Sequence, residues 1–188
     1  MDKAAEILNA GGVALLPTDT VYGLMASPLH PEAVSKIFAL KGRAAAKNLP
    51  VLVADMAQAE ALGVGLTPRR KALLRVNALT AVLPLGRPPA WLAGRKEVAV
   101  RIPNTLALCT LLQQTGPLLA TSANASGQAT PANVPAILAQ LSGTPDIVVN
   151  DGPRTARPST LIDSQTTPFA VLRRGALSDA TLREILAL

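Results

Sequence analysis

The hydrophobic positions of this chain fall into two kinds of pattern that alternate along the sequence. Uninterrupted apolar runs at 13–17, 49–54 and 117–121 are typical of buried strands. Apolar residues spaced three or four apart at 31–40 and 106–114 are typical of helices that pack one face against a core. The alternation predicts a protein in which helices and strands are mixed throughout.

Glycine, proline and polar clusters separate these patterns and set the boundaries of the other elements. We expect further helices at 3–10, 56–62, 67–78 and 134–142, and a last helix after an N-cap at Ser178. We expect further strands at 79–85, 97–103 and 146–150, and a closing hairpin of 159–163 and 169–174. These elements predict the α/β (mixed α+β) class, with a twisted mixed β-sheet flanked by helices.

Composition and length favour one globular domain spanning 1–188. A chain of 188 residues can bury a sizeable core, and a hydrophobic fraction of 49% excludes disorder. The chain starts with Asp2, Lys3 and Glu6 instead of a basic stretch and an apolar run, so we expect no secretory signal and a cytoplasmic location. Residues 102–145 carry no charge, but polar residues, Pro and Gly interrupt them too often for a membrane span.

The net charge of the chain indicates which class of partner it binds. A net charge of +6 and a pI near 10.1 favour an anionic partner such as a nucleotide or a nucleic acid. Proteins that stack single-stranded bases need several exposed rings, and this chain has only one Trp, one Tyr and two Phe. A base-stacking RNA module is therefore not favoured.

Several common catalytic motifs do not occur in the sequence. It has no P-loop, dinucleotide-binding fingerprint or HExxH motif. The one cysteine, Cys109, excludes an internal disulfide and a Cys-rich zinc site, and the one histidine, His30, lies in a predicted loop where a catalytic triad is not expected. The sequence shows no tight acidic cluster, so any Mg²⁺ is expected to bind through substrate phosphates.

Two polar strings have the chemistry of anion sites. Lys41 and Arg43, in KGR at the exit of the 31–40 helix, suit a polyphosphate, although a solvated helix end explains them equally. Ser122 and Asn124, in TSANASG after the 117–121 strand, supply donors of the kind that hold anions, although they also suit a plain turn.

Two further strings have the chemistry of a small-molecule site. In PTDTVYGL (17–24), Thr20 and Asp19 offer groups that bind amino or carboxyl groups, while Tyr22 is typical of a half-buried packing residue. Arg101 lies in the apolar 97–103 strand, where an unpaired charge is costly, so it needs a carboxylate from a ligand or from an acidic neighbour.

The closing hairpin carries candidates for a phosphate clamp. Ser159 and Thr160 lie at the start of its first strand, and Arg173 and Arg174 end its second strand. Because side chains alternate along a strand, only one of the two arginines can share the inward face.

Six strings in this order, PTDTVYGL, KGR, VAVRIP, TSANASG, PSTLID and VLRRG, resemble the YrdC-type threonylcarbamoyl-AMP synthase family over nearly the whole chain. The resemblance implies a single YrdC-like domain of the short form, with a concave basic substrate cleft. It implies the condensation of L-threonine, bicarbonate or CO₂, and ATP to threonylcarbamoyl-AMP and pyrophosphate, with Mg²⁺ bound through the ATP phosphates. The product serves the t⁶A modification of tRNA, so tRNA or the downstream threonylcarbamoyl transferase complex is an implied partner and a membrane is not.

The resemblance also implies roles for individual residues. The implied catalytic tetrad is Lys41, Arg43, Ser122 and Asn124. The implied L-threonine ligands are Thr20, Arg101 and Ser159. The implied ATP ligands are Arg43, Ser122, Thr130 and Arg173.

Three positions depart from the family's pattern. Ala44 follows KGR where the family commonly has Pro, and Lys47 stands where an amide side chain often contacts ATP. The segment DGPRTARPST (151–160) replaces a glycine-rich one, so Arg154 and Arg157 are expected to reshape or charge the rim of the pocket.

Three other functions compete with this interpretation. A non-catalytic RNA-binding module with a basic concave surface is supported by the net charge and by Arg69, Arg70, Lys71 and Arg75, although a solvated helix face explains these four residues equally. Carbamoyl-adenylating relatives that use carbamoyl phosphate resemble larger chains with zinc-finger cysteines. A sugar-phosphate lyase needs an acidic metal-binding cluster.

Overall fold

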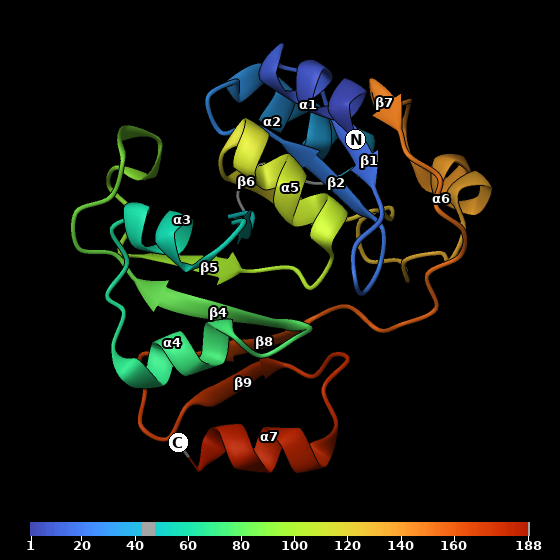
Figure 1. Cartoon of the computed structure of the whole chain (residues 1–188). Coiled ribbons are helices and arrows are strands. Elements are labelled where there is room, and N and C mark those ends of the chain that lie inside the picture. The colour runs from blue at the N-terminus through green and yellow to red at the C-terminus, as the bar shows by residue number, and fades with distance from the viewer. Residues whose placement is uncertain (43–47, 188) are drawn as a thin grey trace.

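One continuous sheet forms the centre of the protein. The computed structural model describes residues 1–42 and 48–187, and in these ranges nine strands join in the order β7-β1-β2-β6-β3-β5-β4-β8-β9. The sheet is mixed: β1–β7, β3–β5 and β4–β8 pair in parallel, and the other neighbouring pairs are antiparallel. Figure 1 shows helices along both sides of this sheet. The predicted fold class is therefore confirmed.

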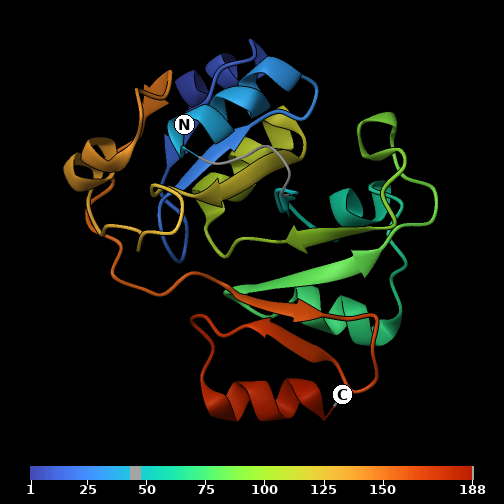
Figure 2. The ribbon, with the colours of Figure 1, turned by 180° about the vertical axis from the view of Figure 1, so that it is seen from behind.

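The bounds of the elements agree with most of the predicted boundaries. The strands are β1 (Ala14–Leu16), β2 (Gly23–Ala26), β3 (Val51–Leu52), β4 (Leu79–Pro84), β5 (Glu97–Arg101), β6 (Leu118–Ser122), β7 (Ile147–Val148), β8 (Thr160–Asp163) and β9 (Ala170–Arg173). The helices are α1 (Asp2–Asn9), α2 (Pro31–Leu40), α3 (Met56–Ala61), α4 (Pro68–Leu74), α5 (Leu106–Thr115), α6 (Val134–Gln140) and α7 (Asp179–Leu186), with a 3₁₀ turn at Ala90–Leu92. In the view from behind, α1 and α7 again lie at opposite ends of the molecule (Figure 2).

Each face of the sheet packs against its own hydrophobic core. Leu15 and Leu24 belong to the larger core, whereas their neighbours Leu16 and Met25 belong to the smaller core with α1 and α5. Because successive side chains of a strand point to opposite faces, the apolar runs that we interpreted as buried strands supply both cores.

Helix boundaries follow from local chemistry. Pro31 occupies the first turn of α2, where its missing N–H costs no hydrogen bond, and Ala33 and Ile37 bury one face of the helix. The last helix starts at a predicted cap, because the Ser178 side chain accepts a hydrogen bond from the Thr181 amide. None of the helices in the described part of the chain is long and apolar enough to span a membrane.

Four elements differ from the sequence-based expectations. The sequence did not predict β2, whose four residues are all buried, because this strand starts at the end of the PTDTVYGL string and shows no alternation. The strands expected at 49–54 and 146–150 are each only two residues long. The helix expected at 67–78 ends at Leu74, and the chain then turns through Ala78, whose φ is 56°, before it enters β4.

Candidate active site

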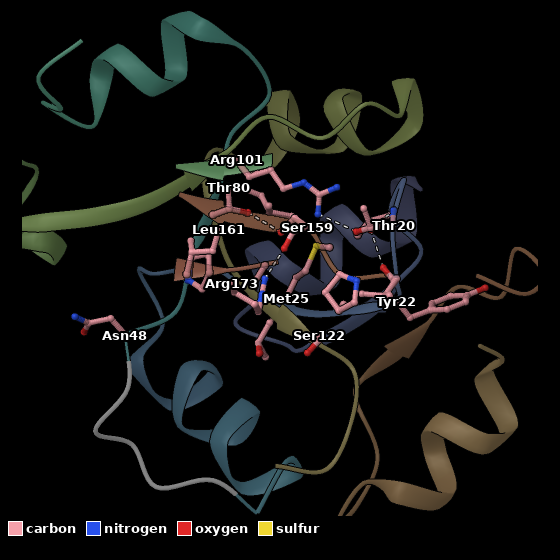
Figure 3. Close-up of a pocket in the computed structure, with 18 residues that line it drawn as sticks. Thr20, Tyr22, Met25, Asn48, Thr80, Arg101, Ser122, Ser159, Leu161 and Arg173 are labelled. Atoms are coloured by element: carbon pink, nitrogen blue, oxygen red, sulfur yellow. Dashed lines mark hydrogen bonds between the residues drawn. The ribbon is translucent and has the colours of Figure 1, made fainter. Parts of the chain in front are cut away.

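A cavity of about 240 Å³ lies on the sheet face that carries the smaller core. Strand alternation explains its lining: Thr80, Arg101 and Leu161 point into the cavity, while their strand neighbours pack into the larger core. Five of the predicted site residues line it: Thr20, Arg101, Ser122, Ser159 and Arg173. Figure 3 shows these side chains around the cavity; Arg101, Ser122 and Arg173 come from β5, β6 and β9, and Thr20 and Ser159 come from connecting segments.

Arg101 is the buried cation of the cavity. It is 6% exposed, its Nη2 lies 2.7 Å from an Asp19 carboxylate oxygen, and its Nη1 donates to Thr20 Oγ1 at 3.0 Å. The sequence left two partners open for this charge, and the structure supplies the acidic neighbour. Arg101 Nε is also buried and has no hydrogen-bond acceptor among the described residues.

The Thr18–Thr20 loop holds its own conformation. Thr18 Oγ1 donates to the Val21 carbonyl at 2.7 Å and accepts from the Thr20 amide at 3.0 Å. These local bonds replace the ladder that ended with β1, as short hydroxyl side chains commonly do in turns. The loop thereby directs Thr20 Oγ1 toward Arg101.

Tyr22 is more buried than we expected. We predicted a half-buried packing residue, but its side chain is fully buried. Its hydroxyl donates to the Gly152 carbonyl at 2.7 Å and accepts from the Asp151 amide at 2.9 Å. A buried phenol needs such partners, and here they come from the segment that follows β7.

Arg173 brings a second positive charge to the same cavity. Its Nη2 donates to the Ser159 carbonyl at 2.8 Å, and Ser159 Oγ lies 2.8 Å from Thr80 Oγ1. Partial burial lowers the pKa of the Arg173 guanidinium below its ordinary value, and the positive charge of Arg101 lowers it further. An anion in the cavity would relieve this repulsion.

The hairpin arginines separate as predicted. Arg173 lines the cavity, whereas Arg174 is exposed and pairs with Asp179 at the start of α7. The expectation that only one of them shares the inward face is confirmed.

Lys41, at the end of α2, holds the loop after β6 by hydrogen bonds. It is 4% exposed, and its Nζ donates to the main-chain carbonyls of Ser122 and Asn124, the latter at 2.7 Å. Its own carbonyl accepts from the Ser126 amide at 2.8 Å. Lys41 is therefore not a solvated helix end, and it ties the exit of α2 to the TSANASG loop.

Asn124 is bonded at every polar atom of its side chain. Its Oδ1 accepts from Ser122 Oγ at 2.6 Å and from Thr130 Oγ1 at 3.0 Å. Its Nδ2 donates to the carbonyls of Ala125 at 2.8 Å and Gln128 at 2.9 Å. The loop folds around this amide, and Ser122 is the residue of the group that reaches the cavity.

The predicted residues thus divide into two groups. One lines the cavity, and the other, Lys41, Asn124 and Thr130, forms the adjoining loop. Arg43 and Lys47 lie outside the described residues. The catalytic and ligand roles implied by the resemblance stay predictions, as does the basic character of the cleft.

Sequence reasoning missed Thr80 and Asn48, which also line the cavity. A lone threonine inside the apolar 79–85 run was the available signal for Thr80. Arg154 does not line the cavity, but its Nε donates to the carbonyl of Thr18, which does, at 3.1 Å. Arg157 is exposed and is not part of the lining.

The basic residues of α4 are engaged within the fold. The Arg69 guanidinium lies 4.6 Å from the centre of the Phe169 ring, Arg70 Nη1 donates to the Gly65 carbonyl at 2.9 Å, and Lys71 pairs with Glu60 at 2.6 Å. Three of the four basic residues that supported an RNA-binding surface therefore make contacts within the protein, which weakens that alternative. Among the described residues, no three His, Cys, Asp or Glu side chains are placed to hold a metal ion.

This chain is similar to known proteins in both sequence and fold. The family model named Sua5/YciO/YrdC, described as telomere recombination, matches residues 6–175. A threonylcarbamoyl-AMP synthase of Bacillus subtilis is 31% identical over 98% of this chain and 56% of its own length. One of Thiobacillus denitrificans is 38% identical over 85% of this chain and 88% of its own length. The crystal structure of Pyrococcus abyssi Sua5 complexed with L-threonine has a TM-score of 0.85 and 31% identity, over 97% of this chain and 56% of that one.

The first curated relatives are longer proteins. The chain spans about half of their length, at 56% for the Bacillus subtilis protein and 53% for a Pyrococcus abyssi threonylcarbamoyl-AMP synthase. The family model matches residues 6–175, which is almost the whole of this chain. The residues that line the cavity all lie within this match. The chain belongs to the Sua5/YciO/YrdC family.

Proposed function

We propose that this chain is an L-threonylcarbamoyladenylate synthase, which condenses L-threonine, bicarbonate or CO₂, and ATP into threonylcarbamoyl-AMP and pyrophosphate. The observation that carries the proposal is the single cavity in which Thr20, Arg101, Ser159, Ser122 and Arg173 meet. It pairs a buried cation and hydroxyl groups, suited to an amino acid, with a second cation suited to phosphate. The names of the relatives and the L-threonine complex of a neighbouring structure support the same activity.

In this proposal the amino acid binds at the Arg101 end of the cavity. A carboxylate there can accept hydrogen bonds from the Arg101 guanidinium, because Arg101 lines the cavity. The nearby Asp19 carboxylate is 2.7 Å from Arg101, so it carries the charge that balances the arginine before the substrate arrives. Thr20 and Ser159 then supply hydroxyls for the remaining polar groups of the substrate.

The reaction needs charge stabilisation more than a nucleophilic side chain. The amine of threonine forms a bond to the carbon of CO₂ and releases a proton to solvent, which gives a carbamate. A carbamate oxygen then attacks the α-phosphorus of ATP as the bond to the pyrophosphate oxygen breaks. Negative charge accumulates at phosphorus and on the leaving group, where positioned cations are most effective.

We assign this charge stabilisation to Arg173, which lines the cavity, and, by the family resemblance, to Arg43. Lys41 does not line the cavity and donates to the Ser122 carbonyl, so we assign it the positioning of Ser122. ATP enters as its Mg²⁺ complex, so the metal ion arrives as part of the substrate. Ser122 and Thr130 are the proposed ligands on the ATP side. The enzyme class is then a nucleotidyltransferase, and tRNA or a threonylcarbamoyl transferase complex receives the product.

Pyrophosphate release by the purified protein tests the proposal. ATP and Mg²⁺ are supplied throughout, and L-threonine and bicarbonate are added and omitted in turn. Release that requires both supports the synthase. Replacing bicarbonate with carbamoyl phosphate tests the carbamoyl-adenylating alternative. No release under any condition, together with salt-sensitive RNA binding, would favour the RNA-binding module instead.

A further inference from the structure

The segment 150–154, which we call the strap, lies against the loop that carries the amino acid site. It leaves β7 and is fixed first by Tyr22, whose buried hydroxyl bonds to the Gly152 carbonyl and the Asp151 amide. Tyr22 lies two positions after Thr20 in the chain. The strap and this loop are therefore joined across 130 positions of sequence.

Arg154 adds a second and a third connection. Its Nε donates to the Thr18 carbonyl at 3.1 Å, and its guanidinium carbon lies 5.9 Å from the centre of the Tyr22 ring. The same guanidinium pairs with the Asp151 carboxylate inside the strap. The main-chain amide of Arg154 donates to the Ala132 carbonyl at 2.8 Å, in the segment that follows the TSANASG loop. Arg154 thus contacts the amino acid side of the site and a neighbour of the loop on the other side.

The contact at Thr18 reaches the cavity through a short chain of hydrogen bonds. Thr18 Oγ1 lies 3.1 Å from Thr20 Oγ1, and Thr20 Oγ1 accepts from Arg101 at 3.0 Å. A shift of the Thr18 backbone therefore changes where Thr20 and Arg101 meet. The carbonyl of Thr18 receives a charged donor, and such hydrogen bonds are stronger than those between neutral groups.

We infer that Arg154 is a positioning residue that holds the Thr18–Thr20 loop in the conformation that binds the amino acid substrate, an inference that rests on the proposed function. The residue acts through the loop and does not line the cavity itself. Its removal should weaken binding of L-threonine and leave the ATP side of the site unchanged. Arg157, an exposed arginine of the same connection that does not line the cavity, provides a matched control.

The test is a kinetic comparison of the wild type with Arg154→Ala, Arg154→Lys and Arg157→Ala, in the pyrophosphate assay with L-threonine and ATP varied separately. We expect the KM for L-threonine of Arg154→Ala to rise about tenfold. The kcat at saturating L-threonine and the KM for ATP should stay within about twofold of wild type. Lysine keeps the charge but lacks the fork that reaches the Thr18 carbonyl and Asp151 together, so Arg154→Lys should show a smaller rise. Arg157→Ala should match wild type.

Two outcomes would overturn the inference. An unchanged KM for L-threonine in folded Arg154→Ala, or in Arg154→Lys where Arg154→Ala does not fold, would make Arg154 a purely structural residue. An equal rise in the KM for ATP would make it a nucleotide ligand. Binding of L-threonine by calorimetry separates this inference from the proposed function. If wild type binds L-threonine but releases no pyrophosphate, the proposed function fails, and the affinities of the variants still decide the role of Arg154; no binding by wild type overturns both.

Discussion

Replacing Lys41 by methionine tests whether a buried ammonium organises the loop after β6. Lys41 is 4% exposed and donates to the carbonyls of Ser122 and Asn124. Methionine keeps most of the apolar stem but supplies no donor. A hydrogen bond to a charged group contributes about 1.5–3 kcal/mol, and a buried carbonyl left without a donor costs about 1–3 kcal/mol. Part of this loss is offset because the variant no longer buries a charge.

We therefore expect Lys41→Met to lower the free energy of unfolding by about 2–4 kcal/mol, or the melting temperature by roughly 5–15 °C for a chain of this size. Urea unfolding followed by far-UV circular dichroism measures the change. Lys36→Met is the matched control on the same helix, because Lys36 is exposed and its 2.6 Å pair with Asp146 is worth no more than about 1 kcal/mol. If Lys41→Met were as stable as Lys36→Met, the buried ammonium would not support the loop and the reasoning would be refuted.

Three further predictions concern Asp146, Arg173 and Tyr22. The hydrogen bond from Lys36 lowers the pKa of Asp146 below its ordinary 3.8. The ionised carboxylate therefore stabilises the fold above pH 3.8, and this effect is lost as the pH falls through the lowered pKa. Thermal melts should show Asp146→Asn less stable than wild type near pH 7, by a difference that shrinks as the pH falls below 3.8. Arg173→Gln relieves the repulsion from Arg101, so calorimetry should find its melting temperature unchanged or raised while pyrophosphate release falls at least about tenfold; a loss of stability with full activity would contradict the anion site. Tyr22→Phe removes a buried hydroxyl with two partners and should lower the free energy of unfolding in urea by about 1–3 kcal/mol.

The pairing of Arg101 with Asp19 shows why the site can exist without its substrate. A buried guanidinium without an acidic neighbour would be strongly destabilising, so an apolar strand tolerates one only where the fold supplies a carboxylate. Asp19 is that carboxylate, and it comes from a loop 82 positions away in sequence. The position of this arginine in its strand was visible in the sequence, but its partner was not.

Patterns of short range were sufficient to predict most of the local structure. Proline at the first turn of α2, the Ser178 cap and the apolar runs act within a few residues, so they predict an element wherever it lies in the fold. The same holds for the opposite directions of Arg173 and Arg174, because alternation is a property of the single strand. The PTDTVYGL string follows β1 as predicted, whereas β6 extends to Ser122 and so includes the first two residues of TSANASG.

Patterns of long range were decided by the tertiary structure alone. The sequence does not specify that β6 lies between β2 and β3, and this order is what brings Ser122 to the cavity that Thr20 and Arg101 share. β2 itself was missed, because its burial comes from neighbours on both sides rather than from its own alternation. From the sequence, Lys41 could equally be a solvated residue at a helix end. It is buried because the loop after β6 packs against it and accepts its hydrogen bonds. The sequence by itself thus determined which groups carry charge and which face of each strand they occupy, while the pairing of strands distant in sequence decided which of those groups meet, because that pairing depends on the packing of the whole sheet.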